Sequence, residues 1–213
     1  MRRPPTPETL ELRQKAEIAH KACDYPLAIE LYQKILAIDP LADDIWVHSA
    51  EILALSGQIP LSITALEKAI EINPDNQLAW HNLAHAYSVK EEWGRAAQAI
   101  ARAVLLAPRS HKSLFIMGNI RRAQGQHKEA VENYKASLRI HEADADTWNN
   151  LGLTLYEMEE FDAAAGAYLN ALKYNVKLAG AHTNLSILLL KVGKLEGARR
   201  AAERALAIEP DNH

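Results

Sequence analysis

The sequence predicts an all-α solenoid of six helix-turn-helix repeats, with twelve helices in all. The chain divides into blocks of 34 residues without an insertion or deletion: 9–42, 43–76, 77–110, 111–144, 145–178 and 179–212. Each block holds two segments of about 14 residues with apolar side chains at helical spacing. Because so short a unit cannot bury its apolar face alone, we expect successive units to stack.

The first helix of each block is indicated by a large residue followed four positions later by a small one. The large column holds Leu12, Trp46, Trp80, Leu114, Trp148 and His182. The small column holds Ala16, Ala50, Ala84, Gly118, Gly152 and Ser186. A second small column marks the second helix and holds Ala28, Ser62, Ala96, Ala130, Ala164 and Ala198. Large residues facing small ones let helices approach closely and interlock.

Glycines and prolines mark the expected helix ends. Gly57, Gly125 and Gly193 stand between the two helices of their blocks, where a left-handed turn costs glycine little. Pro26 and Pro60 stand at the start of a second helix, where a missing N–H does no harm. The prolines that close second helices are Pro40, Pro74, Pro108 and Pro210.

The third block carries the clearest family pattern and reads QLAWHNLAHAYSVKEEWGRAAQAIARAVLLAPRS. The residues on the pattern W-x2-L-G-x2-Y…A…A…P are Trp80, Leu83, Ala84, Tyr87, Ala96, Ala103 and Pro108. The chain therefore resembles the tetratricopeptide repeat (TPR) family over all six blocks. The resemblance implies a right-handed superhelix, here a single array over 9–212, whose first helices face a concave groove. We expect residues 1–8 to be a short disordered lead.

Composition favours a binding protein over an enzyme. A net charge of −3 and the lack of a long apolar segment predict neither a nucleic-acid partner nor a membrane association. The sequence contains no phosphate-binding loop, nucleophile elbow or cysteine-based zinc spacing, so we expect no catalysis and no cofactor. The one cysteine, Cys23, fills a slot that holds glycine in sister blocks, and a single thiol suits a cytoplasmic protein.

An asparagine series is the strongest binding signal on the predicted first helices. Asn82, Asn150 and Asn184 share one column, Asn149 precedes Asn150, and Asn119 lies on the same helical face of block four. An amide offers a donor and an acceptor, which matches a peptide unit. The series is similar to the asparagine ladder in the TPR arms of peptide O-linked N-acetylglucosamine transferases, which implies that it grips an extended polypeptide. The alternative is that these amides bond only neighbouring helices.

Charge is uneven along the blocks. Residues 77–144 carry 10 basic and 6 acidic side chains, whereas residues 1–76 carry 7 and 12. Lys112 and Arg122, near the groove of block four, are expected to steer an acidic stretch of a ligand. A solvated surface with ordinary variation is the alternative.

Histidines are expected to line the N-terminal half of the groove. His81 and His85 stand four residues apart on one helical face, and His48 in block two could lie beside them. Such a set is also typical of zinc or copper ligands, but the spacing is common and we predict no metal. The other histidines are expected to form no comparable cluster: His20, His111, His127, His141 and His182.

These features predict a protein–protein interaction scaffold that holds an extended or helical polypeptide segment in its groove. One alternative is the substrate-recruiting arm of a larger enzyme, such as a glycosyltransferase. Another is a scaffold that self-associates through block six, because no polar capping helix follows that block.

Overall fold

The computed structural model describes residues 6–209, and within that range the predicted all-α fold is confirmed, with twelve helices and no strand. Unit 1 comprises Met1–Pro108 and unit 2 comprises Arg109–His213. The helices of unit 1 are α1 (Pro7–Lys21), α2 (Tyr25–Ile38), α3 (Asp43–Leu55), α4 (Ile59–Ile72), α5 (Gln77–Val89) and α6 (Trp93–Leu106). The helices of unit 2 are α7 (His111–Ala123), α8 (His127–Ile140), α9 (Ala145–Glu157), α10 (Phe161–Tyr174), α11 (Ala179–Lys191) and α12 (Leu195–Ile208).

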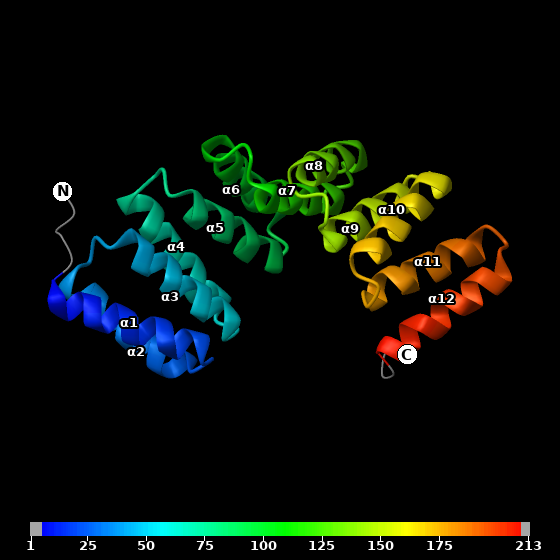
Figure 1. Cartoon of the computed structure of the whole chain (residues 1–213). Coiled ribbons are helices and arrows are strands. Elements are labelled where there is room, and N and C mark those ends of the chain that lie inside the picture. Colours follow the sequence, from blue (N-terminus) through cyan, green and yellow to red (C-terminus); the bar gives the residue numbers. More distant parts are fainter. Residues whose placement is uncertain (1–5, 210–213) are drawn as a thin grey trace. The chain divides into compact units, whose positions relative to one another are not determined.

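Each unit holds three helix-turn-helix repeats (Figure 1). Within a unit, every helix packs on the next one along the chain. First helices of successive repeats also touch, since α3 contacts α5, α7 contacts α9, and α9 contacts α11. A single array over 9–212 stays a prediction, and residues 210–213 lie outside the described range.

The small columns serve the packing role that the sequence predicts. Gly118 and Gly152 lie against the rings of Tyr134 and Tyr168, which come from the second helix of the same repeat. A Cβ atom added at Gly152 would stand 2.7 Å from two ring carbons of Tyr168. Both tyrosines are fully buried. Glycine is therefore required at these two positions by the close approach of an aromatic ring.

Every turn inside a repeat contains one residue with a positive φ. Glycine fills the position in three repeats, with φ near 74–78° at Gly57, Gly125 and Gly193. The other three repeats place Cys23, Glu91 and Glu159 there, with φ of 57°, 57° and 62°. The three glycines match the sequence prediction, and the three other residues hold the same left-handed turn at a cost that glycine avoids.

The start of α1 corrects the predicted disordered lead. The helix begins at Pro7, and the side chain of Thr6 caps it by accepting the Thr9 N–H at 3.2 Å. Residues 6–8 therefore belong to the first helix and its cap, whereas residues 1–5 lie outside the described range. The proline positions at Pro26 and Pro60 are confirmed, each in the first turn of its helix.

A ring N–H ties the loop between repeats to the first helix that follows it. The ring nitrogens of Trp46, Trp80, Trp148 and His182 lie 2.8–3.0 Å from the backbone oxygens of Pro40, Pro74, Glu142 and Val176, respectively. The bond forms whether or not the loop residue is proline, because a backbone carbonyl is the acceptor. The large column thus fixes loop geometry as well as packing.

Candidate functional site

Every residue of the predicted site lies on the first helix of a repeat. Unit 1 carries His48 on α3 and His81, Asn82 and His85 on α5. Unit 2 carries Lys112, Asn119 and Arg122 on α7, Asn149 and Asn150 on α9, and Asn184 on α11. The predicted residues therefore divide into a histidine-rich set in unit 1 and an asparagine-rich set in unit 2.

In unit 2, Asn119 and Asn150 form an amide pair between two first helices. Asn150 Nδ2 donates to Asn119 Oδ1 at 2.9 Å, and the Tyr134 hydroxyl donates to the same oxygen at 2.7 Å. Burial raises the pKa of Tyr134 to about 12, so its hydroxyl keeps its proton at neutral pH. Two donors saturate the Asn119 carbonyl. The side-chain amide group of Asn119 and the side-chain carbonyl of Asn150 take no part in these two bonds.

Asn149 and Asn184 form a second amide pair with the same polarity. Asn184 Nδ2 donates to Asn149 Oδ1 at 3.0 Å, from α11 to α9. The side-chain amide group of Asn149 and the side-chain carbonyl of Asn184 take no part in this bond. Each pair thus joins neighbouring helices and keeps one donor group and one acceptor group of the kind that a peptide backbone requires. Bonding between helices, the alternative reading of the series, is present, and groove binding stays a prediction.

Arg122 is held by an ion pair within unit 2. Its Nη1 donates to Glu157 Oε1 at 2.9 Å, and His127 Nδ1 lies 3.4 Å from Glu157 Oε2. The carboxylate neutralises the guanidinium, which weakens the steering role expected for Arg122. Lys112 is exposed on the first turn of α7. Of the two predicted cations, Lys112 is the one that has no ion pair among residues 6–209.

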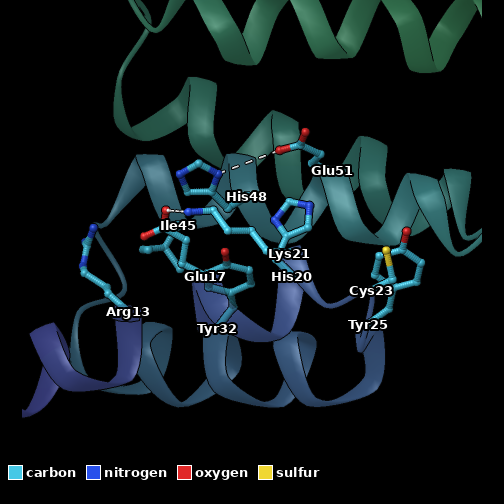
Figure 2. Close-up of a pocket in the computed structure, with 10 residues that line it drawn as sticks. All are labelled: Arg13, Glu17, His20, Lys21, Cys23, Tyr25, Tyr32, Ile45, His48 and Glu51. Carbon is cyan, nitrogen blue, oxygen red and sulfur yellow. Dashed lines mark hydrogen bonds and ion pairs between the residues drawn. The ribbon is translucent and has the colours of Figure 1, made fainter. Parts of the chain in front are cut away.

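In unit 1, His48 lies in a cleft of about 680 Å³ formed by α1, α2 and α3 (Figure 2). The His48 ring stacks on Tyr32, with ring centroids 6.0 Å apart and planes 17° apart. His48 Nδ1 lies 3.9 Å from Glu51 Oε2. The pKa of Glu51 is lowered, first by hydrogen bonding with His48 and also by His20, while burial opposes the shift. Glu51 is therefore a carboxylate at neutral pH.

The sequence reasoning missed His20, which lines the same cleft. Helix α1 faces α3 at an offset of 31 residues, seen in the ion pair between Arg13 and Asp44. The same offset sets His20 against Glu51. Comparing positions 31 residues apart, rather than 34, would have found this neighbour in the sequence.

No group of three or more histidine, cysteine, aspartate or glutamate side chains in the described part of the chain is placed to hold a metal ion. His81 and His85 keep their helical spacing on α5, with His81 half-buried and His85 exposed. Asn82 is half-buried beside them. His111 and His141, which the sequence places in no cluster comparable to that of His81 and His85, pack as a pair with ring centroids 4.9 Å apart.

The sixth repeat exposes several large apolar side chains. They are Ile187, Leu190, Val192, Leu195 and Leu206, with 40–66% of each residue exposed. Self-association through this repeat stays a prediction. In residues 6–209, no helix combines the length and the apolar character needed to cross a membrane.

Two family profiles match the chain. The profile described as "TPR repeat" matches residues 50–88 and 118–159, and the profile described as "Tetratricopeptide repeat" matches residues 149–213. The chain belongs to the tetratricopeptide repeat family. The matched segments contain Asn82, Asn119, Asn150, Asn184 and Glu51.

Curated relatives of this TPR chain are larger proteins. Anaphase-promoting complex subunit 3 of Schizosaccharomyces pombe is 24% identical over 184 residues, which cover 86% of this chain and 26% of the relative. Human protein O-mannosyl-transferase TMTC1 is 26% identical over 175 residues, which cover 77% and 20%. The peroxisomal targeting signal receptor of Candida albicans is 23% identical, with 77% and 34% covered. The chain spans about a third or less of the length of these relatives.

Solved structures share the fold at low sequence identity. The type IV pilus biogenesis factor PilW superimposes with a TM-score of 0.88 at 17% identity, covering 98% of this chain and 97% of PilW. A chain of the APC/C hetero-tetramer Cut9-Hcn1 gives a TM-score of 0.84 at 19% identity, covering 96% of this chain and 40% of that chain. YrrB, described as a TPR protein with an unusual peptide-binding site, gives 0.68 at 18%, covering 87% and 95%.

Proposed function

We propose that this TPR chain is a non-catalytic interaction module that holds a polypeptide segment of another protein against its first helices. The two amide pairs of unit 2 carry the proposal. Asn150 donates to Asn119 and Asn184 donates to Asn149, so both pairs have the same polarity. Each pair leaves one amide group and one carbonyl for a ligand, and a peptide unit offers the complementary acceptor and donor.

Bonds of this type recognise the backbone and not a particular side chain. The affinity they provide is consequently modest and tolerant of sequence, with each bond contributing about 0.5–1.5 kcal/mol net. Lys112, exposed at the start of α7, adds a charge beside this face and favours an acidic residue of the ligand there. A cytoplasmic partner fits the exposed thiol of Cys23.

The test is a peptide selection on the full chain. A random peptide display library is panned, and the affinity of a selected peptide is measured by fluorescence anisotropy. We expect the double variant Asn150→Ala, Asn184→Ala to lose about 1–3 kcal/mol of binding free energy. The control is Asn133→Ala on α8, whose amide donates to the Glu129 backbone oxygen at 2.7 Å. Unchanged affinity in the double variant, or a wild-type chain that selects no peptide, would contradict the proposal.

Because the double variant also loses two bonds between helices, its folding must be measured separately. Thermal unfolding followed by circular dichroism shows whether the array stays folded at the assay temperature. A second pair of variants, Asn119→Asp and Asn149→Asp, keeps the side-chain size and the oxygen that accepts the bond between helices, but removes the amide group left for a ligand. A loss of binding in folded aspartate variants assigns the effect to the amide group.

A second candidate is a recruiting arm of a larger enzyme. The similarity to the protein named as an O-mannosyl-transferase, of which this chain covers only 20%, favours it. In that case the same face would bind a segment of the enzyme's protein substrate. Identifying the full-length transcript decides between the two, because an enzyme arm requires a catalytic domain in the same chain.

A further inference from the structure

The cleft of unit 1 has a charge balance that selects a particular ligand side chain, and the inference drawn from it rests on the proposed function. Its permanently charged lining residues are Arg13, Glu17, Lys21 and Glu51. Three of them are neutralised by ion pairs. Lys21 Nζ lies 2.7 Å from Glu17 Oε1, and Arg13 pairs with Asp44 on α3.

Glu51 is the remaining charge. Its single ion-pair partner in the described range is His48, whose Nδ1 lies 3.9 Å from Glu51 Oε2, and a histidine does not carry the permanent charge of a lysine or an arginine. The Glu51 side chain is 47% exposed, lines the cleft and is turned towards the His48 ring (Figure 2). The cleft thus presents one carboxylate without a permanent cation.

A flat ring lies beside this carboxylate. The His48 side chain is 44% exposed, and Tyr32 stacks on it and fixes its orientation. Tyr32 is itself buried, so it supports the ring from inside the protein. A carboxylate next to a fixed planar ring matches a guanidinium, which accepts stacking on its face and donates a pair of N–H bonds from its edge.

We propose that the cleft between α1, α2 and α3 binds an arginine side chain of the partner polypeptide, with Glu51 as the carboxylate acceptor and His48 as the stacking surface. The excess of acidic side chains over residues 1–76, 12 against 7 basic, favours the approach of a cationic segment. An acidic side chain in the cleft would meet Glu51 without a free cation to compensate. Unit 1 therefore differs from the Lys112 face of unit 2, where an acidic residue is favoured.

The experiment uses the full chain and a nine-residue acetylated and amidated peptide that alternates arginine with glycine. A matched peptide replaces arginine by citrulline, which keeps the shape of the side chain and removes its charge. Binding is measured by NMR titration. We expect Glu51→Gln to weaken binding of the arginine peptide about threefold to tenfold. The control is Glu30→Gln on α2, an exposed carboxylate outside the cleft that pairs with Lys34 at 2.6 Å.

Three results would overturn the inference. They are equal affinity in wild type and Glu51→Gln, equal affinity for the arginine and citrulline peptides, and an equal loss in Glu30→Gln. A lysine–glycine peptide that binds as tightly as the arginine peptide would overturn the choice of a guanidinium.

The same variant separates this inference from the proposed function. If peptides selected on the wild type bind Glu51→Gln with unchanged affinity but fail to bind the Asn150, Asn184 double variant, the arginine site is wrong and the interaction module stands. If the wild type selects no peptide at all, the proposed function itself is wrong.

Discussion

Replacing Gly152 by alanine places a methyl group against the ring of Tyr168. The new Cβ would lie 2.7 Å from Cδ1 and Cε1 of that ring, whereas carbon atoms in contact are ordinarily about 3.5–4.0 Å apart. The ring is 1% exposed, so it has no space into which to move. Overpacking of this kind costs about 1–3 kcal/mol.

A second effect of the substitution has the opposite sign. Alanine is favoured over glycine inside a helix by about 1 kcal/mol. Gly166, on α10 of the same unit, isolates this effect because it is exposed and an added Cβ would meet nothing within 4 Å. We expect Gly166→Ala to stabilise the chain by about 1 kcal/mol. Gly152→Ala should then be less stable than Gly166→Ala by about 1–3 kcal/mol, which is the cost of the clash alone.

Urea denaturation of wild type and both variants measures the difference. Adding Tyr168→Leu to Gly152→Ala provides a further check, since the second repeat already combines Ala50 with Leu66 at the corresponding positions. The double variant should recover part of the loss. Equal stability changes in Gly152→Ala and Gly166→Ala would refute the packing argument.

Three further predictions concern the turns, the loops and the buried tyrosine. Glu91→Gly should stabilise the chain by about 0.5–1 kcal/mol in urea denaturation, because Glu91 holds a φ of 57° that glycine adopts without strain; a loss of stability would contradict this. Trp80→Phe should cost about 1 kcal/mol or more by the same measurement, because phenylalanine cannot donate to the Pro74 oxygen; an unchanged midpoint would show that the ring N–H contributes nothing. The Tyr134 pKa, raised by burial to about 12 from 10, means that its stabilising contribution is complete below pH 10 and is lost as the pH rises towards 12. Stability measured against pH should therefore fall less steeply between pH 10 and 12 in Tyr134→Phe than in wild type, and identical slopes would show that Tyr134 is not the titrating group.

The fold was predictable because its determinants are local and periodic. The small columns, the glycine turns and the prolines at Pro26 and Pro60 each act within one repeat and recur at the same position. The turn residues Cys23, Glu91 and Glu159 could not be assigned a left-handed conformation from residue type. Their alignment with Gly57, Gly125 and Gly193 in the 34-residue period was the signal that could have indicated this conformation.

The candidate site was less predictable because its contacts join different repeats. That the predicted polar residues bind a ligand stays a prediction, and the hydrogen-bond and ion-pair partners of these residues could not be read from the sequence. Nothing in the sequence pattern marks Glu157, the carboxylate that neutralises Arg122, as its partner. His20 was expected to belong to no cluster, although it lines the cleft with His48 and Glu51.

The missing rule concerns the offset between neighbouring first helices. Two polar pairs within the units, Arg13 with Asp44 and Asn119 with Asn150, join residues 31 apart. Two others, Asn149 with Asn184 and Arg122 with Glu157, join residues 35 apart. The two offsets differ by four residues, which is about one helical turn, and they lie on either side of the 34-residue period.

Residues in the same column of successive repeats are therefore not the ones that bond each other in these pairs. A ladder of equivalent asparagines, as the columns suggested, would leave every amide free for a ligand. The offset instead lets a residue from one column bond a residue from another, so each pair uses the amide group of one asparagine and the side-chain carbonyl of the other to join helices. The groups that remain are the amide groups of Asn119 and Asn149 and the side-chain carbonyls of Asn150 and Asn184. Donors and acceptors therefore alternate along α7, α9 and α11, and a bound peptide backbone would have to match that alternation.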